Sequence, residues 1–197
     1  MRHEWVTSTR AAGETNEDLF WVGPTRLGTL VVLADGLDGA AAAAQAVAFV
    51  RETFEEGRVF DAYFWKHFLS NVDGELNSKN ETALVVCHLI GGRLTGAACG
   101  DVRVFAGEQS LSEGHAKARL GRNFDGSNPG VFEAELAAGT RLAIVSNGVW
   151  EYLPKDEFAR TLRDSFFDSV AVDLTWRAAP DGRWQDDATA IVIELRE

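Results

Sequence analysis

Basic residues, cysteines and long apolar runs are all scarce in this sequence. Its 19 Lys and Arg residues stand against 30 Asp and Glu residues, which gives a formal net charge of −11 at pH 7. Sequence-independent nucleic-acid binding requires clustered basic side chains, and so does docking on an anionic membrane surface. We therefore expect neither a nucleic-acid nor a membrane partner. An excess of carboxylates can instead collect into a site for divalent cations.

The two cysteines, Cys87 and Cys99, each lie within an apolar run. Two such residues predict buried, unpaired thiols and exclude a disulfide framework or a cysteine-based zinc site. The longest near-apolar stretch, residues 39–50, is far shorter than the roughly 20 residues of a transmembrane helix. The first residues contain no apolar core of a signal peptide. We therefore expect a cytoplasmic protein.

Apolar runs bounded by glycine turns predict strands, and three regions show the period of helices instead. No internal repeat or shift of composition divides the 197 residues, so we expect a single domain over 1–197. Strands are predicted at 19–22, 29–34, 82–90, 93–99, 102–106, 131–135, 141–146 and 188–195, helices at 40–54, 60–77 and 155–177, and a loop-rich stretch at 107–130.

Glycine-containing hairpins indicate antiparallel sheets, yet several strands, such as 84–90, are apolar on both faces. An antiparallel strand that is buried on both faces needs a second sheet on one side and helices on the other. The sequence therefore predicts an α+β fold, a four-layer α/β/β/α sandwich with two central antiparallel sheets.

Five acidic or amide residues each lie at an end of a predicted strand. Asp-Gly and Asn-Gly pairs are common turn sequences, which is the simple alternative for each residue alone. Strand ends of one sandwich can meet at one edge, where carboxylates repel one another unless they bind cations. Oxygen ligands suit hard ions such as Mg²⁺ or Mn²⁺. The five residues are Asp18, Asp35, Asp101, Asn147 and Asp186.

Six short segments resemble the motifs of the metal-dependent Ser/Thr protein phosphatases of type 2C. They occur in the family's order and span nearly the whole chain, so the set is specific although each segment is short. The segments are Asn16-Glu17-Asp18, the Asp-Gly turn at 34–39, the strand at 81–86, Gly100-Asp101-Val102-Arg103, the strand at 142–146 with Asn147-Gly148, and Asp186-Asp187 before the last strand.

The resemblance implies the same four-layer sandwich and a site for two Mg²⁺ or Mn²⁺ ions, with a weaker third. Asp35 would bridge the two ions, and the Gly36 carbonyl would bind one of them. Asp186 and Asn147 would hold the other ion.

The resemblance also implies the chemistry. Glu17 and Asp18 would ligate or orient metal-bound water, and Asp101, together with Asn147, would contribute to the weaker third metal site. A water activated by the metals would attack the phosphorus of phosphoserine or phosphothreonine in a protein substrate. No covalent enzyme intermediate is needed.

The sequence departs from the family at three places. Asn147 stands where the family has Asp, so one negative charge is missing beside a dication. The phosphate-binding Arg of the family is expected five residues before Asp18, where this chain has Gly13. Arg10 is the candidate replacement, and the candidate catalytic residues are Asp18, Asp35 and Arg10. The segment 107–130 leaves room only for a brief loop in place of the family's flap.

We expect a monomeric phosphatase that acts in signalling by opposing a Ser/Thr kinase. The first alternative is a catalytically weak or inactive relative that binds a phosphoprotein or kinase partner, which Asn147 and Gly13 favour. An unrelated sandwich protein or a small-molecule phosphohydrolase is the remaining alternative.

Overall fold

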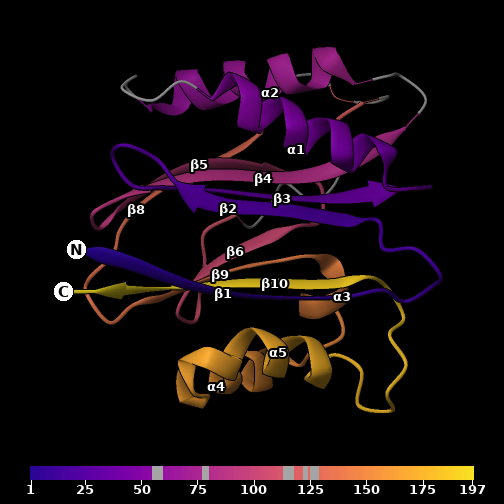
Figure 1. Cartoon of the computed structure of the whole chain (residues 1–197), viewed down its shortest axis with the longest axis vertical. Helices are drawn as coiled ribbons and strands as arrows, with labels where there is room; N and C mark the ends of the chain where they lie inside the picture. The colour runs from indigo at the N-terminus through magenta and orange to yellow at the C-terminus, as the bar shows by residue number, and fades with distance from the viewer. Residues whose placement is uncertain (55–59, 77–79, 113–117, 122–123, 125–128) are drawn as a thin grey trace.

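Two five-stranded antiparallel sheets lie face to face in a computed structural model of the chain (Figure 1). The structure describes residues 1–54, 60–76, 80–112, 118–121, 124 and 129–197. The first sheet contains, in spatial order, β1 (Arg2–Arg10), β10 (Ala188–Arg196), β9 (Arg141–Val145), β6 (Arg103–Ala106) and β7 (Gln109–Ser110). The second contains β2 (Asp18–Pro24), β3 (Thr29–Leu37), β4 (Glu81–Ile90), β5 (Arg93–Cys99) and β8 (Gly130–Glu135).

Helices cover the outer face of each sheet (Figure 1). The second sheet carries α1 (Ala41–Thr53) and α2 (Ala62–Glu75), and the first carries α4 (Lys155–Asp164) and α5 (Phe167–Arg177). A single turn, α3 (Asn147–Trp150), follows β9. This arrangement confirms the predicted α+β fold with four layers. Within the described residues, no helix is both long enough and apolar enough to cross a lipid bilayer.

Three apolar cores fill the spaces between the four layers, and β4 contributes to two of them. Leu84 and Val86 pack toward α1 and α2, whereas Val85 and Cys87 pack between the two sheets. This alternation explains why the strand is apolar on both faces. Cys99 on the neighbouring β5 belongs to the helix-side core, so the two thiols face opposite sides of the sheet and both are free.

The structure adds elements that the sequence did not predict. β1 is an edge strand along β10 in which only Ser8 is buried, so no apolar run marked it. The single helix predicted over 155–177 is two helices with a break at Ser165 and Phe166. Both differences concern surface elements and leave the order of layers unchanged.

Strand ends from both sheets meet at one edge of the sandwich. β2 and β10 begin there, and β3 and β9 end there, because Asp18 pairs with Asp35 and Ala190 pairs with Val145. This edge lies beside α3, on the opposite side of the molecule from the two chain termini (Figure 1). The antiparallel register therefore brings together residues that are far apart in the sequence.

Candidate functional site

Asp18 and Asp35 form the buried centre of this edge. They lie directly opposite each other on β2 and β3 and are only 4% and 7% exposed. Ser146 donates a hydrogen bond to Asp18 Oδ2 at 2.7 Å, and the Thr82 hydroxyl donates to the backbone carbonyl of Asp35 at 2.8 Å. Asp18 Oδ1 and Asp35 Oδ2 are buried without a hydrogen-bond partner among the described residues.

Burial controls the protonation of both carboxyls. Desolvation raises the pKa of Asp18 to about 7, although side-chain hydrogen bonds from Ser146 and Thr189 oppose the shift. Desolvation also raises the pKa of Asp35 to about 8, and the nearby charges of Asp18 and Asp101 raise it further. Carboxyl pKa values that burial and neighbouring charges shift this far are typical of functional sites.

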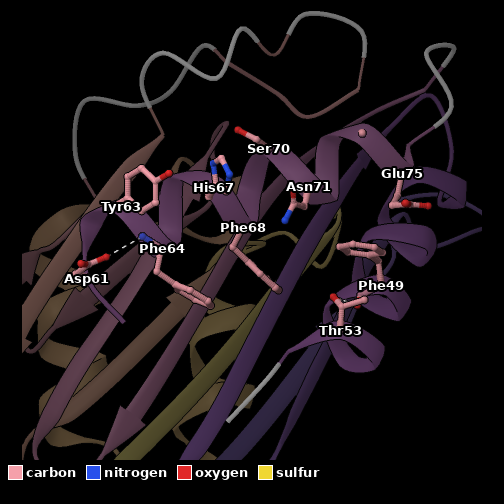
Figure 2. Close-up of a pocket in the computed structure, with 11 residues that line it drawn as sticks. Phe49, Thr53, Asp61, Tyr63, Phe64, His67, Phe68, Ser70, Asn71 and Glu75 are labelled. Carbon is pink, nitrogen blue, oxygen red and sulfur yellow. Dashed lines mark hydrogen bonds between the residues drawn. The ribbon is translucent and has the colours of Figure 1, made fainter. Parts of the chain in front are cut away.

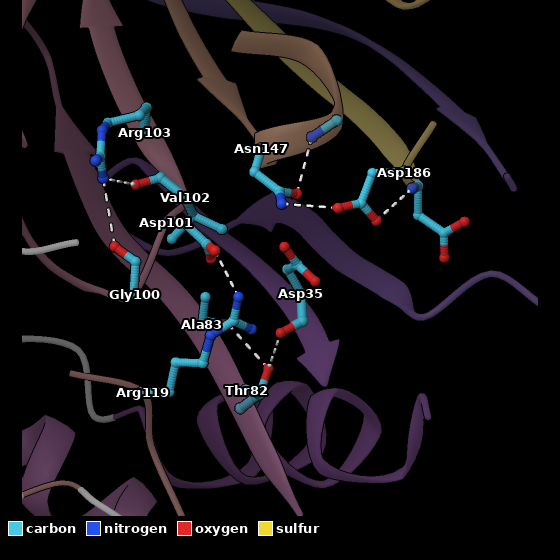
Figure 3. A network of polar contacts seen from close by, with 12 residues as sticks. Asp35, Thr82, Ala83, Gly100, Asp101, Val102, Arg103, Arg119, Asn147 and Asp186 are labelled. Carbon is cyan, nitrogen blue, oxygen red and sulfur yellow. Dashed lines mark hydrogen bonds and ion pairs between the residues drawn. The ribbon is translucent and has the colours of Figure 1, made fainter. Parts of the chain in front are cut away.

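Asn147 and Asp186 are joined directly to each other. The Asn147 amide Nδ2 donates to Asp186 Oδ2 at 2.8 Å, and the Asn147 Oδ1 accepts the Gly148 N–H at 2.8 Å. The other oxygen of Asp186, Oδ1, accepts the backbone N–H of Asp187 at 2.8 Å. Figure 3 shows this pair facing Asp35 across the edge. The Asn147 amide therefore already binds one oxygen of Asp186, although the resemblance implies that the two residues hold a metal ion together.

Asp187 fixes the loop that precedes β2. Its Oδ1 accepts the Ala12 N–H at 2.7 Å, and its Oδ2 accepts the Glu17 N–H at 2.5 Å. The Glu17 carbonyl in turn accepts the Gly36 N–H at 3.2 Å. A Cβ atom at Gly36 would lie 2.6 Å from the Gly39 carbonyl oxygen, so only glycine fits this turn. Backbone hydrogen bonds therefore hold Glu17 and Gly36 at this edge.

Arg10 and Arg119 lie in different surroundings. Arg10 ends β1 two residues after Ser8, whose hydroxyl bonds Thr175 of α5, so Arg10 faces α5 too. Its guanidinium lies 5.4 Å from the centre of the Trp176 ring. The structure thus does not bring Arg10 to the carboxylates. Arg119, by contrast, forms an ion pair with Asp101 and lowers the pKa of Asp35 through its charge (Figure 3).

Four residues that hold the site were not among the sequence-based candidates. Ser146, Thr82 and Asp187 lie within or beside segments that resemble family motifs, so position relative to a strand end was an available signal. Arg119 lies in the loop-rich stretch 107–130, where no pattern marked it. The four are Thr82, Arg119, Ser146 and Asp187.

The carboxylate oxygens offer a partial fit to divalent metal ions. In the described part of the chain, no three acidic, His or Cys side chains already converge as a metal cage. Buried oxygens without partners nevertheless occur on Asp18, Asp35 and Asp101, and such oxygens are costly unless a cation or proton compensates them. The fit is good on the Asp35 side and poorer at Asp186, whose two oxygens already accept hydrogen bonds.

A large cavity lies elsewhere, on α1 and α2 (Figure 2). It has a volume of about 950 Å³, and none of its lining residues belongs to the acidic edge. Its polar groups already serve the helix: Asp61 caps α2 by accepting the Phe64 N–H at 2.8 Å, and Tyr63 stacks on His67. We therefore place the candidate site at the acidic edge.

The raised pKa values predict a pH-dependent stability of the metal-free protein. Asp18 and Asp35 titrate near 3.8 when unfolded and near 7 and 8 when folded. Between these values the folded state binds more protons, so the free energy of unfolding should fall as the pH rises from 5 to 8. The expected slope approaches about 1.4 kcal/mol per pH unit for each carboxyl.

Denaturant unfolding in the presence of a chelator measures this slope. The double variant Asp18→Asn with Asp35→Asn should flatten the dependence, and saturating Mn²⁺ should weaken it in the natural chain. A free energy of unfolding that rises between pH 5 and 8 would show that these carboxyls are ionised when metal-free.

We compared the chain with known protein families, curated proteins and solved structures, and only the solved structures gave matches. The sequence matches no protein-family model and no curated protein significantly. A bacterial serine phosphatase superposes with a TM-score of 0.79 at 17% identity, covering 100% of this chain and 98% of that one. PppA of Pseudomonas aeruginosa gives 0.80 at 17% identity, covering 98% of both chains. The Mycobacterium tuberculosis serine/threonine phosphatase PstP gives 0.76 at 18%, covering 100% of both.

One of the similar structures contains metal ions. The catalytic domain of PstP has been solved in complex with two manganese ions, and it superposes on 99% of this chain with a TM-score of 0.72 at 17% identity. The resemblance seen in the sequence is thus confirmed in the arrangement of the whole chain. This protein has the fold of the bacterial serine/threonine phosphatases of type 2C.

Proposed function

We propose that this protein is a metal-dependent phosphatase that hydrolyses phosphoserine and phosphothreonine in proteins at the acidic edge. The observation that carries the proposal is the pair of buried carboxylates, Asp18 and Asp35, each with an oxygen that lacks a hydrogen-bond partner among the described residues. In this proposal the protein is a cytoplasmic monomer that acts in signalling and removes phosphoryl groups that a Ser/Thr kinase has added.

The residues at the acidic edge have different parts in this proposal. Asp35 and the Gly36 carbonyl would hold Mg²⁺ or Mn²⁺, with Asp18 and Glu17 beside them. Ser146 keeps the Asp18 carboxylate in one orientation, and Thr82 keeps the backbone of Asp35 in place. When bound, the metal would supply a lowered pKa for a nearby water and positive charge for the phosphoryl oxygens.

A second candidate function has a specific observation in its favour. The Asn147–Asp186 hydrogen bond satisfies Asp186 with a neutral donor, where the family resemblance implies a second metal. A chain with one weakened metal position would retain the shape of the site and bind a phosphoprotein or a kinase with little or no turnover. We rank this candidate second because the Asp35 side keeps its unpartnered oxygens.

Release of p-nitrophenol from its phosphate, with and without Mn²⁺, tests the proposed function. We expect weak turnover that requires high Mn²⁺ and stops when EDTA is added. Absence of turnover at every Mn²⁺ concentration, combined with saturable binding of a phosphothreonine peptide, would reject the first function and support the second.

A further inference from the structure

Arg119 places a guanidinium inside the acidic edge. Its Nη2 pairs with Asp101 Oδ2, and both side chains are only 19% exposed. Its Nη1 is buried and has no hydrogen-bond partner among the described residues. An unpaired buried donor is unfavourable unless it meets an acceptor, so this nitrogen is available for an oxyanion.

The backbone around Arg119 is held firmly against β4. Leu120 and Thr82 exchange two backbone hydrogen bonds of 2.9 and 3.0 Å, and the Gly121 N–H donates to Asp73 Oδ1 at 2.6 Å. Gly121 has φ of +107°, and a Cβ atom there would lie 2.2 Å from the Asn80 carbonyl oxygen. This segment is therefore tied to the strand that also holds Asp35 through Thr82.

The side chain of Arg119 is held as well as its backbone. A Cβ atom built on Gly100 would lie 3.4 Å from Arg119 Cγ, so the stem of the arginine packs over that glycine. Asp101, which pairs with the guanidinium, is itself fixed because Trp150 Nε1 donates to its carbonyl at 2.6 Å. A side chain that is already held in place loses less conformational entropy when it binds a ligand.

The same geometry argues against Arg10 in this position. The Arg10 guanidinium lies against Trp176, on the face of the first sheet that α5 covers. A guanidinium fork can keep one nitrogen on a carboxylate and offer another to a phosphoryl oxygen, which a lysine can do only as a point charge. Arg119 meets this requirement beside Asp35 (Figure 3).

We propose that Arg119 is the phosphate-binding arginine of this site and that Asp101 is its positioning residue. The inference rests on the proposed function, since it names the residue that would hold the phosphoryl group there. It assigns Asp101 to the orientation of Arg119 in place of the third metal that the family resemblance implies.

Calorimetric titration of Mg²⁺-loaded protein with inorganic phosphate tests this proposal without any turnover. The variants are Arg119→Gln, Arg119→Lys and Asp101→Asn, with Arg10→Gln as the matched control. Arg119→Gln should raise the dissociation constant for phosphate at least tenfold, and Arg119→Lys should recover part of the loss because it restores the charge. Asp101→Asn should give a smaller loss, and Arg10→Gln should stay within twofold of the natural chain.

The outcomes separate this proposal from the proposed function. Unchanged phosphate binding in Arg119→Gln, or a loss confined to Arg10→Gln, would overturn the role of Arg119 even if the enzyme turns over p-nitrophenyl phosphate. No phosphate binding by the natural chain would overturn it too. Tight phosphate binding that depends on Arg119 in a protein without turnover would support this proposal and reject the phosphatase function.

Discussion

Replacing Asp35 with Asn should lower Mn²⁺-stimulated turnover by at least about 100-fold, since loss of a metal ligand exceeds the usual cost of changing an outer-shell partner. Asp35 is the side chain that would hold the metal in the proposed function, and it is 7% exposed with one oxygen that lacks a hydrogen-bond partner among the described residues. The fold should remain intact, because the amide is nearly the same size and removes a buried carboxyl that resists ionisation. Steady-state kinetics over a range of Mn²⁺ concentrations measures the loss.

Asp38→Asn is the matched control for this experiment. Asp38 lies three residues further along the same turn and is exposed, so it loses the same charge without touching the buried pair. Its turnover should stay within about twofold of the natural chain, as expected for an exposed substitution. If Asp35→Asn kept most of its activity while remaining folded, the assignment of Asp35 as the central metal ligand would be wrong.

Replacing Asn147 with Asp should lower the Mn²⁺ concentration for half-maximal occupancy at least tenfold, or about 1.4 kcal/mol. The substitution adds a negative charge next to Asp186 and removes the amide donor that now bonds it. Two facing carboxylates repel each other in the metal-free protein, and a bound cation removes this repulsion. The variant should therefore bind Mn²⁺ more tightly. Calorimetric titration of both forms with Mn²⁺ measures the change.

Asn71→Asp is the control for added charge, since Asn71 lines the cavity on α2 and is separate from the acidic edge. It should leave Mn²⁺ affinity unchanged. Equal affinity in the natural chain and Asn147→Asp would show that position 147 is not a ligand. Tighter Mn²⁺ binding in Asn147→Asp with no turnover at all would favour the second function, the binding of a phosphoprotein or kinase.

Much of the fold could be predicted because buried strands in a sandwich leave a clear pattern. β4 is apolar on both faces, and that pattern requires a layer on each side of the sheet. β1 left no such pattern, because it is an edge strand whose residues are mostly polar. Its pairing with β10 identifies it as a strand, whereas its composition does not. An edge strand of this composition can be identified only when the strand that pairs with it is known.

Some residues of the candidate site could likewise be predicted from the sequence, and others could not. Positions at strand ends, such as Asp18 and Asp35, could be predicted to meet because antiparallel register determines which ends share an edge. The direction of a single side chain could not be predicted, and Arg10 illustrates this, since the pairing of β1 turns it toward Trp176. Arg119 reaches the edge because the next residue, Leu120, forms a bridge with Thr82, a tertiary contact with no local sequence signal.

Anomalous scattering from a crystal soaked in Mn²⁺ tests the central claim most directly, namely that the edge around Asp35 is a divalent-metal site. We predict a strong manganese peak within bonding distance of the Asp35 carboxylate and the Gly36 carbonyl, and a weaker peak between Asn147 and Asp186. A soaked crystal with no manganese peak at Asp35 would contradict the proposed metal-dependent function.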